Sequence, residues 1–209
     1  MKIYSNTHKS KYHLVFIHGL HKSYNDWNIT SCKNAKHINI EETLKSKYNT
    51  HLVQIEASDY FRSIIDVAND IYDKLTISNV TIIAHSYGCF YAIQLGLLDH
   101  MRFRRLLLLD PTLPTPSYMN YLQELSEPLR RYQYDNFDRF PDITSLHNKV
   151  IVRIHKSLQE IDNDYFCLAS TATKKNLESH IIVHYKMTHM IHYKIPHVVI
   201  KSIRDIAKL

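Results

Sequence analysis

The sequence predicts an α/β fold in which a mostly parallel sheet carries helices on both faces. Short apolar segments alternate along the chain with segments whose apolar residues recur at helical spacing, as in successive β–α–β units. The chain has 209 residues, which suffice for one sizeable core but hardly for two. We therefore expect a single domain spanning residues 1–209.

Six segments are predicted to be strands because each is a short apolar run bounded by polar or turn residues. They are residues 12–17, 51–56, 80–84, 105–109, 150–154 and 181–185. Ligands bind at the carboxyl ends of the strands in sheets of this kind. His18, Ser86 and Asp110 each follow the end of a predicted strand, so we expect these side chains to lie along one edge of the sheet.

Helices are predicted over residues 63–75, over residues 89–98 and from Pro196 towards the C-terminus. Ser63 stands directly before the first apolar residue of its helix, with Asp66 three positions further on, which is the pattern of a helix N-cap. Proline suits the first position of a helix because the amide that it lacks has no acceptor there.

A different composition interrupts this order between residues 111 and 148. Five of the six prolines of the chain lie between Pro111 and Pro141. The same stretch contains Tyr118, Tyr121 and two further tyrosines. We therefore expect a short cap or lid insertion of turns and small helices, with an aromatic-lined entrance.

The composition argues against several classes of protein. The three cysteines, Cys32, Cys89 and Cys167, are widely spaced and fit no disulfide framework, which favours the cytoplasm. No apolar run reaches the ~18 residues of a membrane span, and the polar N-terminus lacks the apolar core of a secretory signal. The net charge of +6 is spread along the chain, so we expect no nucleic-acid partner.

The segment Ala84-His85-Ser86-Tyr87-Gly88 is predicted to form a strand, a sharp turn and the start of a helix. A serine on such a turn exposes its hydroxyl and is a candidate nucleophile. The amide of Tyr87 at the helix start and the amide of Leu20 after Gly19 are candidate oxyanion donors. The alternative interpretation is an ordinary loop that contains an incidental serine.

Four segments together resemble the α/β-hydrolase fold family, in a compact member similar to serine esterases and lipases. They are VFIHGL with Trp27 downstream, IIAHSYG, LLLLDPT, and THMIHYKIP before the last helix. Ala84 replaces the first glycine of the family's G-x-S-x-G turn, and the family's first two strands and its D-x-x-G-x-G segment are not evident. The resemblance implies a three-layer fold and a triad in the chain order serine, acid, histidine, with no cofactor.

His189 is the histidine that best fits the base of such a triad. It precedes Pro196 by seven residues, in the loop where the family carries its base, and His192 is the second choice. His180 and His184 fall in or beside the last strand, and His197 falls in the last helix. We expect no metal site among these histidines because no carboxylate or cysteine lies at suitable short spacing.

The acid of the triad has several candidates. The family usually carries it after the strand that precedes the histidine-bearing strand, where Glu160, Asp162 and Asp164 lie. We select Asp162 on its distance from the histidine and keep Asp164 open. Asp110 is a competitor because some members of the family place the acid one strand earlier.

These residues predict a serine hydrolase that cleaves a carboxylic ester through an acyl-enzyme intermediate. The substrate is expected to be a small-molecule ester or thioester with an apolar acyl part. Two alternatives remain open: thioesterase or acyl-transfer chemistry at the same site, and a catalytically inactive binding protein with this fold. The sequence determines neither the substrate nor the oligomeric state.

Overall fold

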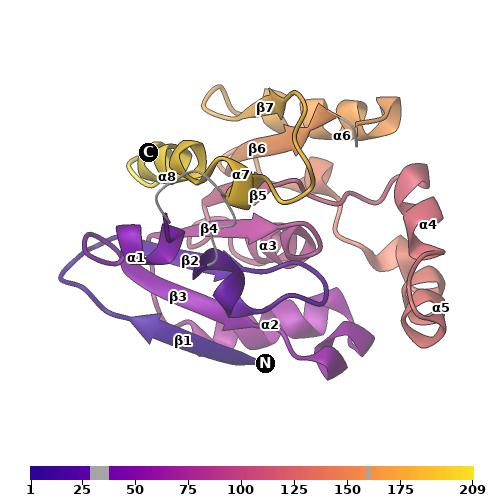
Figure 1. The fold of residues 1–209 in the computed structure, drawn as a ribbon, viewed down its shortest axis with the longest axis horizontal. Coiled ribbons are helices and arrows are strands. Elements are labelled where there is room, and N and C mark those ends of the chain that lie inside the picture. Colours follow the sequence, from indigo (N-terminus) through magenta and orange to yellow (C-terminus); the bar gives the residue numbers. More distant parts are fainter. Residues whose placement is uncertain (29–37, 159–160) are drawn as a thin grey trace.

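One sheet organises the chain. A computed structural model describes residues 1–28, 38–158 and 161–209, and in these ranges seven strands pair in the order β1-β3-β2-β4-β5-β6-β7 (Figure 1). β1 is antiparallel to β3, and every other neighbouring pair is parallel. The strands are β1 Lys2–Asn6, β2 His13–Ile17, β3 Asn49–Gln54, β4 Val80–His85, β5 Arg105–Leu109, β6 Ile151–Ser157 and β7 His180–His184.

Helices pack on both faces of the sheet. The described α-helices are α1 Ile40–Leu44, α2 Ile64–Lys74, α3 Gly88–Leu98, α4 Pro116–Leu122, α5 Glu127–Asp135, α6 Asn163–Lys174, α7 Ile191–Lys194 and α8 Pro196–Ile206. Short 3-10 helices are η1 Tyr24–Asn28, η2 Ala57–Phe61, η3 Phe137–Arg139 and η4 Ile143–Ser145. α1 and α8 pack on one face, and α2, α3 and α6 pack on the other.

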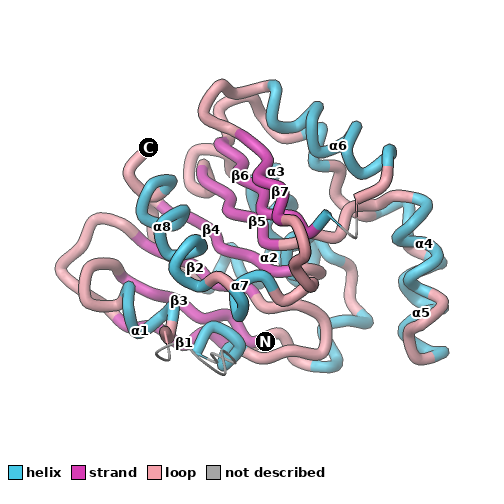
Figure 2. The backbone as a smooth tube through the Cα atoms, turned by 45° about the horizontal axis from the view of Figure 1, so that its top comes forward, coloured by secondary structure: helices cyan, strands magenta, loops and turns pink. Residues whose placement is uncertain are grey.

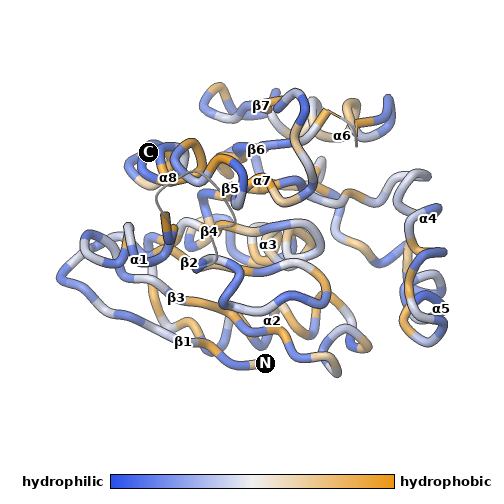
Figure 3. Tube along the Cα trace, viewed as in Figure 1, coloured by the Kyte–Doolittle hydropathy of each residue, from blue (hydrophilic) through white to orange (hydrophobic). Residues whose placement is uncertain are grey.

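The alternation of side chains along the strands divides the core into two layers. In β2, Leu14 and Phe16 pack with α1 and α8, whereas Val15 and Ile17 pack towards α2 and α3. All four side chains are fully buried, and each such burial stabilises the fold by about 1.5–3 kcal/mol. α8 alternates between hydrophobic and hydrophilic residues (Figure 3), because only one side of this helix meets the sheet.

The predicted elements occur in the predicted order, but β1, α1, α6 and α7 were not predicted and β6 is longer than predicted. The predicted cap of α2 is present, since Ser63 Oγ accepts from the amide of Asp66 at 3.0 Å. The sequence did not reveal β1, an edge strand in which only Ile3 is half-buried, because an exposed edge needs no apolar alternation. α6 also went unrecognised, and β6 extends to Ser157, three residues past its predicted end.

The segment between β5 and β6 holds α4, α5 and two 3-10 helices. α4 and α5 lie together at the right-hand side of the molecule in two views (Figures 1 and 2). Tyr118 of α4 packs against Phe90 of α3 at a ring-centroid distance of 5.6 Å and against Phe140 at 5.7 Å. Aromatic packing therefore fixes this segment against α3.

Two sequence expectations about the chain as a whole can be compared with the described residues. Within these residues, none of the helices has both the length and the apolar character that a membrane crossing requires. Cys89 and Cys167 are free thiols, the first buried and the second exposed. Cys32 lies outside the described residues.

Candidate active site

Ser86 occupies the sharp turn between β4 and α3. Its φ angle is 53°, in the left-handed region that residues with a side chain rarely adopt. The amide of Ser86 donates to the carbonyl of Leu109 at 3.0 Å, which holds the turn against the end of β5. This backbone conformation projects the hydroxyl beyond the carboxyl ends of the strands, as a nucleophile requires.

Two glycines allow the chain to pass closely around this serine. A Cβ atom on Gly88 would lie 2.5 Å from the carbonyl oxygen of His18 and 2.8 Å from that of Ile17. A Cβ atom on Gly19 would lie 3.1 Å from Ser86 Cβ. The start of α3 and the end of β2 therefore approach so closely that Gly88 has no room for a side chain.

Gly88→Ala is expected to destabilise the protein by about 1–3 kcal/mol, because the new methyl group meets backbone atoms that cannot move aside. The matched control is Gly96→Ala in the same helix. There the new Cβ meets side-chain carbons of Leu146 and Leu106 at 3.0 and 3.3 Å, which can adjust, and alanine favours a helix interior by about 1 kcal/mol. Urea unfolding measures both changes, and equal stability of Gly88→Ala and the wild type would contradict the close approach.

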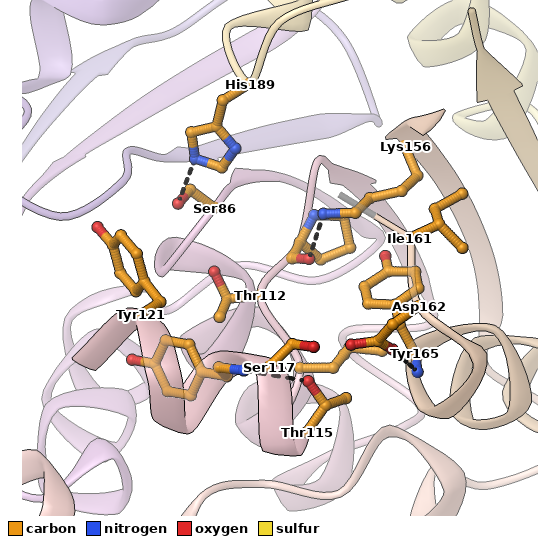
Figure 4. A pocket seen from close by; sticks show the side chains of 13 residues that line it. Ser86, Thr112, Thr115, Ser117, Tyr121, Lys156, Ile161, Asp162, Tyr165 and His189 are labelled. Carbon is orange, nitrogen blue, oxygen red and sulfur yellow. Dashed lines mark hydrogen bonds between the residues drawn. The ribbon is translucent and has the colours of Figure 1, made fainter. Parts of the chain in front are cut away.

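His189 lies in the loop between β7 and α7 and points towards Ser86 (Figure 4). The Ser86 hydroxyl donates to His189 Nε2 at 2.7 Å. His85 Nε2 donates to the backbone carbonyl of His189 at 3.0 Å, which anchors the loop to the end of β4. The His189 side chain is 38% exposed, so a bound molecule can reach it.

Asp110, directly after β5, supplies the carboxylate beside His189. His189 Nδ1 donates to Asp110 Oδ2 at 3.0 Å. Ser157 donates to the same carboxylate through its amide at 3.1 Å and its hydroxyl at 3.2 Å, and Lys156 Nζ lies 3.0 Å from Oδ1. Asp110 is fully buried, and these donors compensate for the loss of water around its charge.

A cavity of about 550 Å³ opens beside Ser86 and His189 (Figure 4). Its walls come from the segment after β5, from α4, and from the end of β6 and the start of α6. The remaining lining residues are Pro111, Thr112, Leu113, Thr115, Ser117, Tyr118, Tyr121, Lys156, Ile161, Asp162 and Tyr165. The lining combines apolar and aromatic groups, several hydroxyls and the ionisable side chains of Lys156 and Asp162.

Comparison of the sequence with protein-family models and with curated proteins gives no match. The structure is similar to many solved structures. An esterase from a marine microorganism is 14% identical, with a TM-score of 0.67 over 98% of each chain. A lipase-esterase related protein from Clostridium acetobutylicum is 15% identical, with a TM-score of 0.64 over 98% of each chain. A hydrolase from Oleispira antarctica is 14% identical, with a TM-score of 0.63 over 97% of this chain and 94% of its own.

These similarities extend over nearly the whole chain, whose own sheet pairs β2 to β7 in parallel. The chain has the α/β-hydrolase fold. In this α/β-hydrolase fold, Ser86, Asp110 and His189 follow β4, β5 and β7, so all three lie at the carboxyl edge of the sheet. That edge is where open α/β sheets bind their ligands.

The structure places Asp162 differently from the sequence expectation. Asp162 is the N-cap of α6, where its Oδ1 accepts from the amide of Tyr165 at 2.5 Å, and it lies across the cavity from His189 (Figure 4). The carboxylate that contacts His189 is that of Asp110. The physical reason is the greater length of β6, which places Lys156 and Ser157 at the sheet edge and leaves Asp162 to begin the next helix. Glu160 lies outside the described residues.

The other late histidines occupy the places that the sequence suggested. His180 and His184 are the first and last residues of β7, and His197 is exposed on α8. His184 Nε2 lies 2.8 Å from His155 Nδ1. His192 belongs to α7, is buried, and packs on Trp27 with ring centroids 5.0 Å apart, so His189 alone of the two contacts Ser86.

The amide of Leu20, an expected oxyanion donor, belongs to the same peptide unit as the carbonyl of Gly19. The carbonyl of Gly19 accepts from His18 Nδ1 at 2.8 Å and from the Tyr60 hydroxyl at 3.2 Å. The N–H and C=O of one planar trans peptide point in opposite directions, so the amide of Leu20 points away from Tyr60. Among the described residues, no backbone carbonyl accepts from this amide.

The same argument applies to the amide of Tyr87. The carbonyl of Ser86 accepts from the amide of Cys89 at 3.0 Å and therefore points into the first turn of α3. The amide of Tyr87, in the same peptide unit, points back out of the helix start. No backbone carbonyl in the described part of the chain accepts from it.

Lys156 and Ser157 are site residues that the sequence did not reveal. Ser157 donates a hydrogen bond to Asp110, and Lys156 forms an ion pair with it. Lys156 Nζ also lies 4.7 Å from the centre of the Tyr165 ring. The sequence signal that could have revealed them is the alternation of side chains along β6. If that alternation continues past Ile154, the strand reaches Lys156 at the carboxyl edge of the sheet. A lysine followed by a serine is typical of a strand end and also of a loop. The composition after Ile154 therefore does not tell a longer strand from a loop.

Proposed function

We propose that this chain is a serine hydrolase that cleaves a carboxylic ester, with Ser86 as nucleophile, His189 as base and Asp110 as acid. The observation that carries the proposal is the continuous chain of hydrogen bonds at 2.7 Å from Ser86 to His189 and 3.0 Å from His189 to Asp110. This chain ends at a serine with a left-handed backbone beside a cavity. The arrangement has the geometry of a Ser-His-Asp triad.

In the acylation step, Ser86 Oγ attacks the carbonyl carbon of the ester while its proton passes to His189 Nε2. The carbonyl oxygen becomes an oxyanion, which the amides of Leu20 and Tyr87 stabilise. When the tetrahedral intermediate collapses, the bond to the alcohol oxygen breaks and His189 returns the proton to that oxygen. An acyl group then remains on Ser86, and the alcohol leaves.

In the deacylation step, His189 Nε2 takes a proton from a water molecule, which attacks the carbonyl carbon of the acyl-enzyme. The second tetrahedral intermediate releases the carboxylic acid, and Ser86 Oγ regains its proton from His189. Asp110 holds the proton on His189 Nδ1, which leaves Nε2 as the acceptor, and stabilises the imidazolium that forms in each step.

The cavity supports a substrate whose acyl part is apolar. Leu113, Ile161 and Pro111 line it together with three tyrosine rings. Its volume of about 550 Å³ is in the range of sites for small organic ligands. The solved structures described above carry the names esterase, lipase-esterase related protein and hydrolase, which supports acyl-transfer chemistry at this site.

A fluorophosphonate probe is expected to label the protein at one residue, Ser86, because such probes phosphonylate serines that an adjacent base activates. Peptide mass spectrometry locates the label. A panel of p-nitrophenyl esters and matched thioesters, with acyl chains of two to twelve carbons, then ranks the substrates by kcat/KM. Faster turnover of thioesters would reassign the chemistry to a thioesterase, and the absence of both label and turnover would favour a binding protein with this fold.

A further inference from the structure

Three buried side chains from distant parts of the sequence meet behind the candidate active site. Asp26 belongs to η1, His85 is the last residue of β4, and His192 lies on α7. One ligand atom from each, a carboxylate oxygen or an imidazole nitrogen, lies within 4.8 Å of the other two. Their exposed fractions are 6%, 1% and 1%, so bulk water does not reach this Asp26–His85–His192 cluster.

Polar atoms of the cluster lack the partners that buried polar atoms normally have. In the described part of the chain, no hydrogen-bond partner exists for Asp26 Oδ2, for His85 Nδ1 or for either ring nitrogen of His192. A buried polar atom without a partner costs about 1–3 kcal/mol. One ligand atom from each of the three residues lies within 4.8 Å of the others, which indicates a shared ligand with which they interact.

The surrounding contacts leave the unpartnered atoms ready to coordinate. His85 Nε2 donates to the carbonyl of His189, so His85 Nδ1 carries a lone pair instead of a proton. The Tyr193 side chain hydrogen-bonds to Asp26. Metal-bound histidines and carboxylates in proteins are held by outer contacts of this kind. Gly19 also keeps space beside His85, since a Cβ there would lie 3.1 Å from Nδ1.

We propose that Asp26, His85 and His192 bind one divalent transition-metal ion of the zinc class, with water as a further ligand. Two imidazoles and one carboxylate form a ligand set that zinc uses in proteins. Bonds of about 2.0–2.1 Å place the ligand atoms of a tetrahedral site about 3.3 Å apart. The ligand atoms now lie within 4.8 Å of one another, so binding one ion requires shifts on the order of 1 Å to reach that spacing.

One charged side chain lies near all three residues of the cluster. Lys22 is a positive charge near all three residues; it opposes the binding of a cation, and because its side chain is solvent-exposed, water and salt weaken that repulsion.

The ion would join η1, the end of β4 and α7 at a point three residues from His189. It has a structural role in this proposal, because Ser86, His189 and Asp110 complete their hydrogen bonds without it. The proposed ion takes no part in the chemistry of the proposed ester hydrolysis, although His85 links its site to the backbone carbonyl of His189.

Zinc binding is tested on the full-length protein, prepared without a histidine tag and dialysed first against a chelator and then against chelator-free buffer. Elemental analysis after equilibration with one equivalent of Zn²⁺ is expected to give one bound ion per chain. Co²⁺ at the same site is expected to give the visible absorption of a tetrahedral complex. At a hundredfold excess over the dissociation constant, Zn²⁺ is expected to raise Tm by about 5 °C or more.

Asp26→Asn and His192→Gln are expected to weaken Zn²⁺ binding at least about 100-fold, since each removes a ligand. The controls are His197→Gln, which removes an exposed histidine of α8, and His13→Gln, which breaks the His13–His51 pair at 3.0 Å. Both are expected to bind Zn²⁺ as the wild type does. Loss of binding in a control with retention in Asp26→Asn would overturn the proposal, as would the absence of stoichiometric metal and of a Tm shift in the wild type.

Discussion

Replacing Ser86 with alanine is expected to lower kcat/KM for ester hydrolysis by about 10⁴-fold or more, because the nucleophile of the acyl-enzyme is lost. Fluorophosphonate labelling is expected to disappear at the same time. Thermal unfolding is expected to stay close to that of the wild type, since alanine keeps the Cβ and the amide that donates to Leu109. Steady-state kinetics with the best ester of the panel measures the loss.

The matched control for this variant is Ser145→Ala. Ser145 lies in η4, is exposed, and does not line the cavity, so its hydroxyl has no part in the proposed reaction. We expect this control to keep wild-type kinetics and labelling. Retained turnover in Ser86→Ala, measured on protein free of contaminating esterase, would refute the proposed mechanism.

Asp110→Asn is expected to lower kcat by about 10³- to 10⁴-fold, because an amide does not hold the proton on His189 Nδ1. The imidazole then takes the other tautomer and no longer accepts the Ser86 proton. Asp162→Asn is the matched control, with the same chemical change in the wall of the same cavity. Its expected effect on kcat is small, since Asp162 caps α6 and does not contact His189.

His189→Ala separates this interpretation from a purely structural role for Asp110. Residues that act as one catalytic unit are not additive, so the double variant Asp110→Asn with His189→Ala is expected to be little slower than His189→Ala alone. If the two losses multiply instead, Asp110 acts on stability and not through His189. An inactive Asp162→Asn beside an active Asp110→Asn would return the acid to the position that the sequence favoured.

Local sequence patterns led to two of the candidate residues, Ser86 and His189, that lie next to each other in the structure. Ser86 was selected because a strand, a turn and a helix follow each other within a few residues of it. A serine on such a turn exposes its hydroxyl. His189 was chosen by its distance from Pro196, which opens α8. Its loop is short, so that distance in sequence limits its position in space.

Local sequence patterns did not identify the carboxylate that contacts His189. Asp110 and Asp162 each stand after a strand and before a turn or helix, and both are compatible with a cap and with a catalytic carboxylate. The choice between them depends on how far β6 extends, and the pairing of β6 with β5 and β7 determines that length. The strands that pair with β6 come from remote parts of the chain. The residues near Asp162 in the sequence therefore do not show which carboxylate contacts His189.

The sequence by itself determined the order of β2 to β7 and of α2, α3 and α8, the α/β class and the serine turn, because hydrophobic periodicity and turn residues act over a few neighbouring positions. Tertiary structure alone decided which carboxylate contacts His189, that Lys156 and Ser157 surround it, and that Asp26 meets His85 and His192. Those contacts join residues as far as 166 positions apart, from Asp26 to His192. Only the packing of the whole sheet and its helices brings such residues within reach of one another.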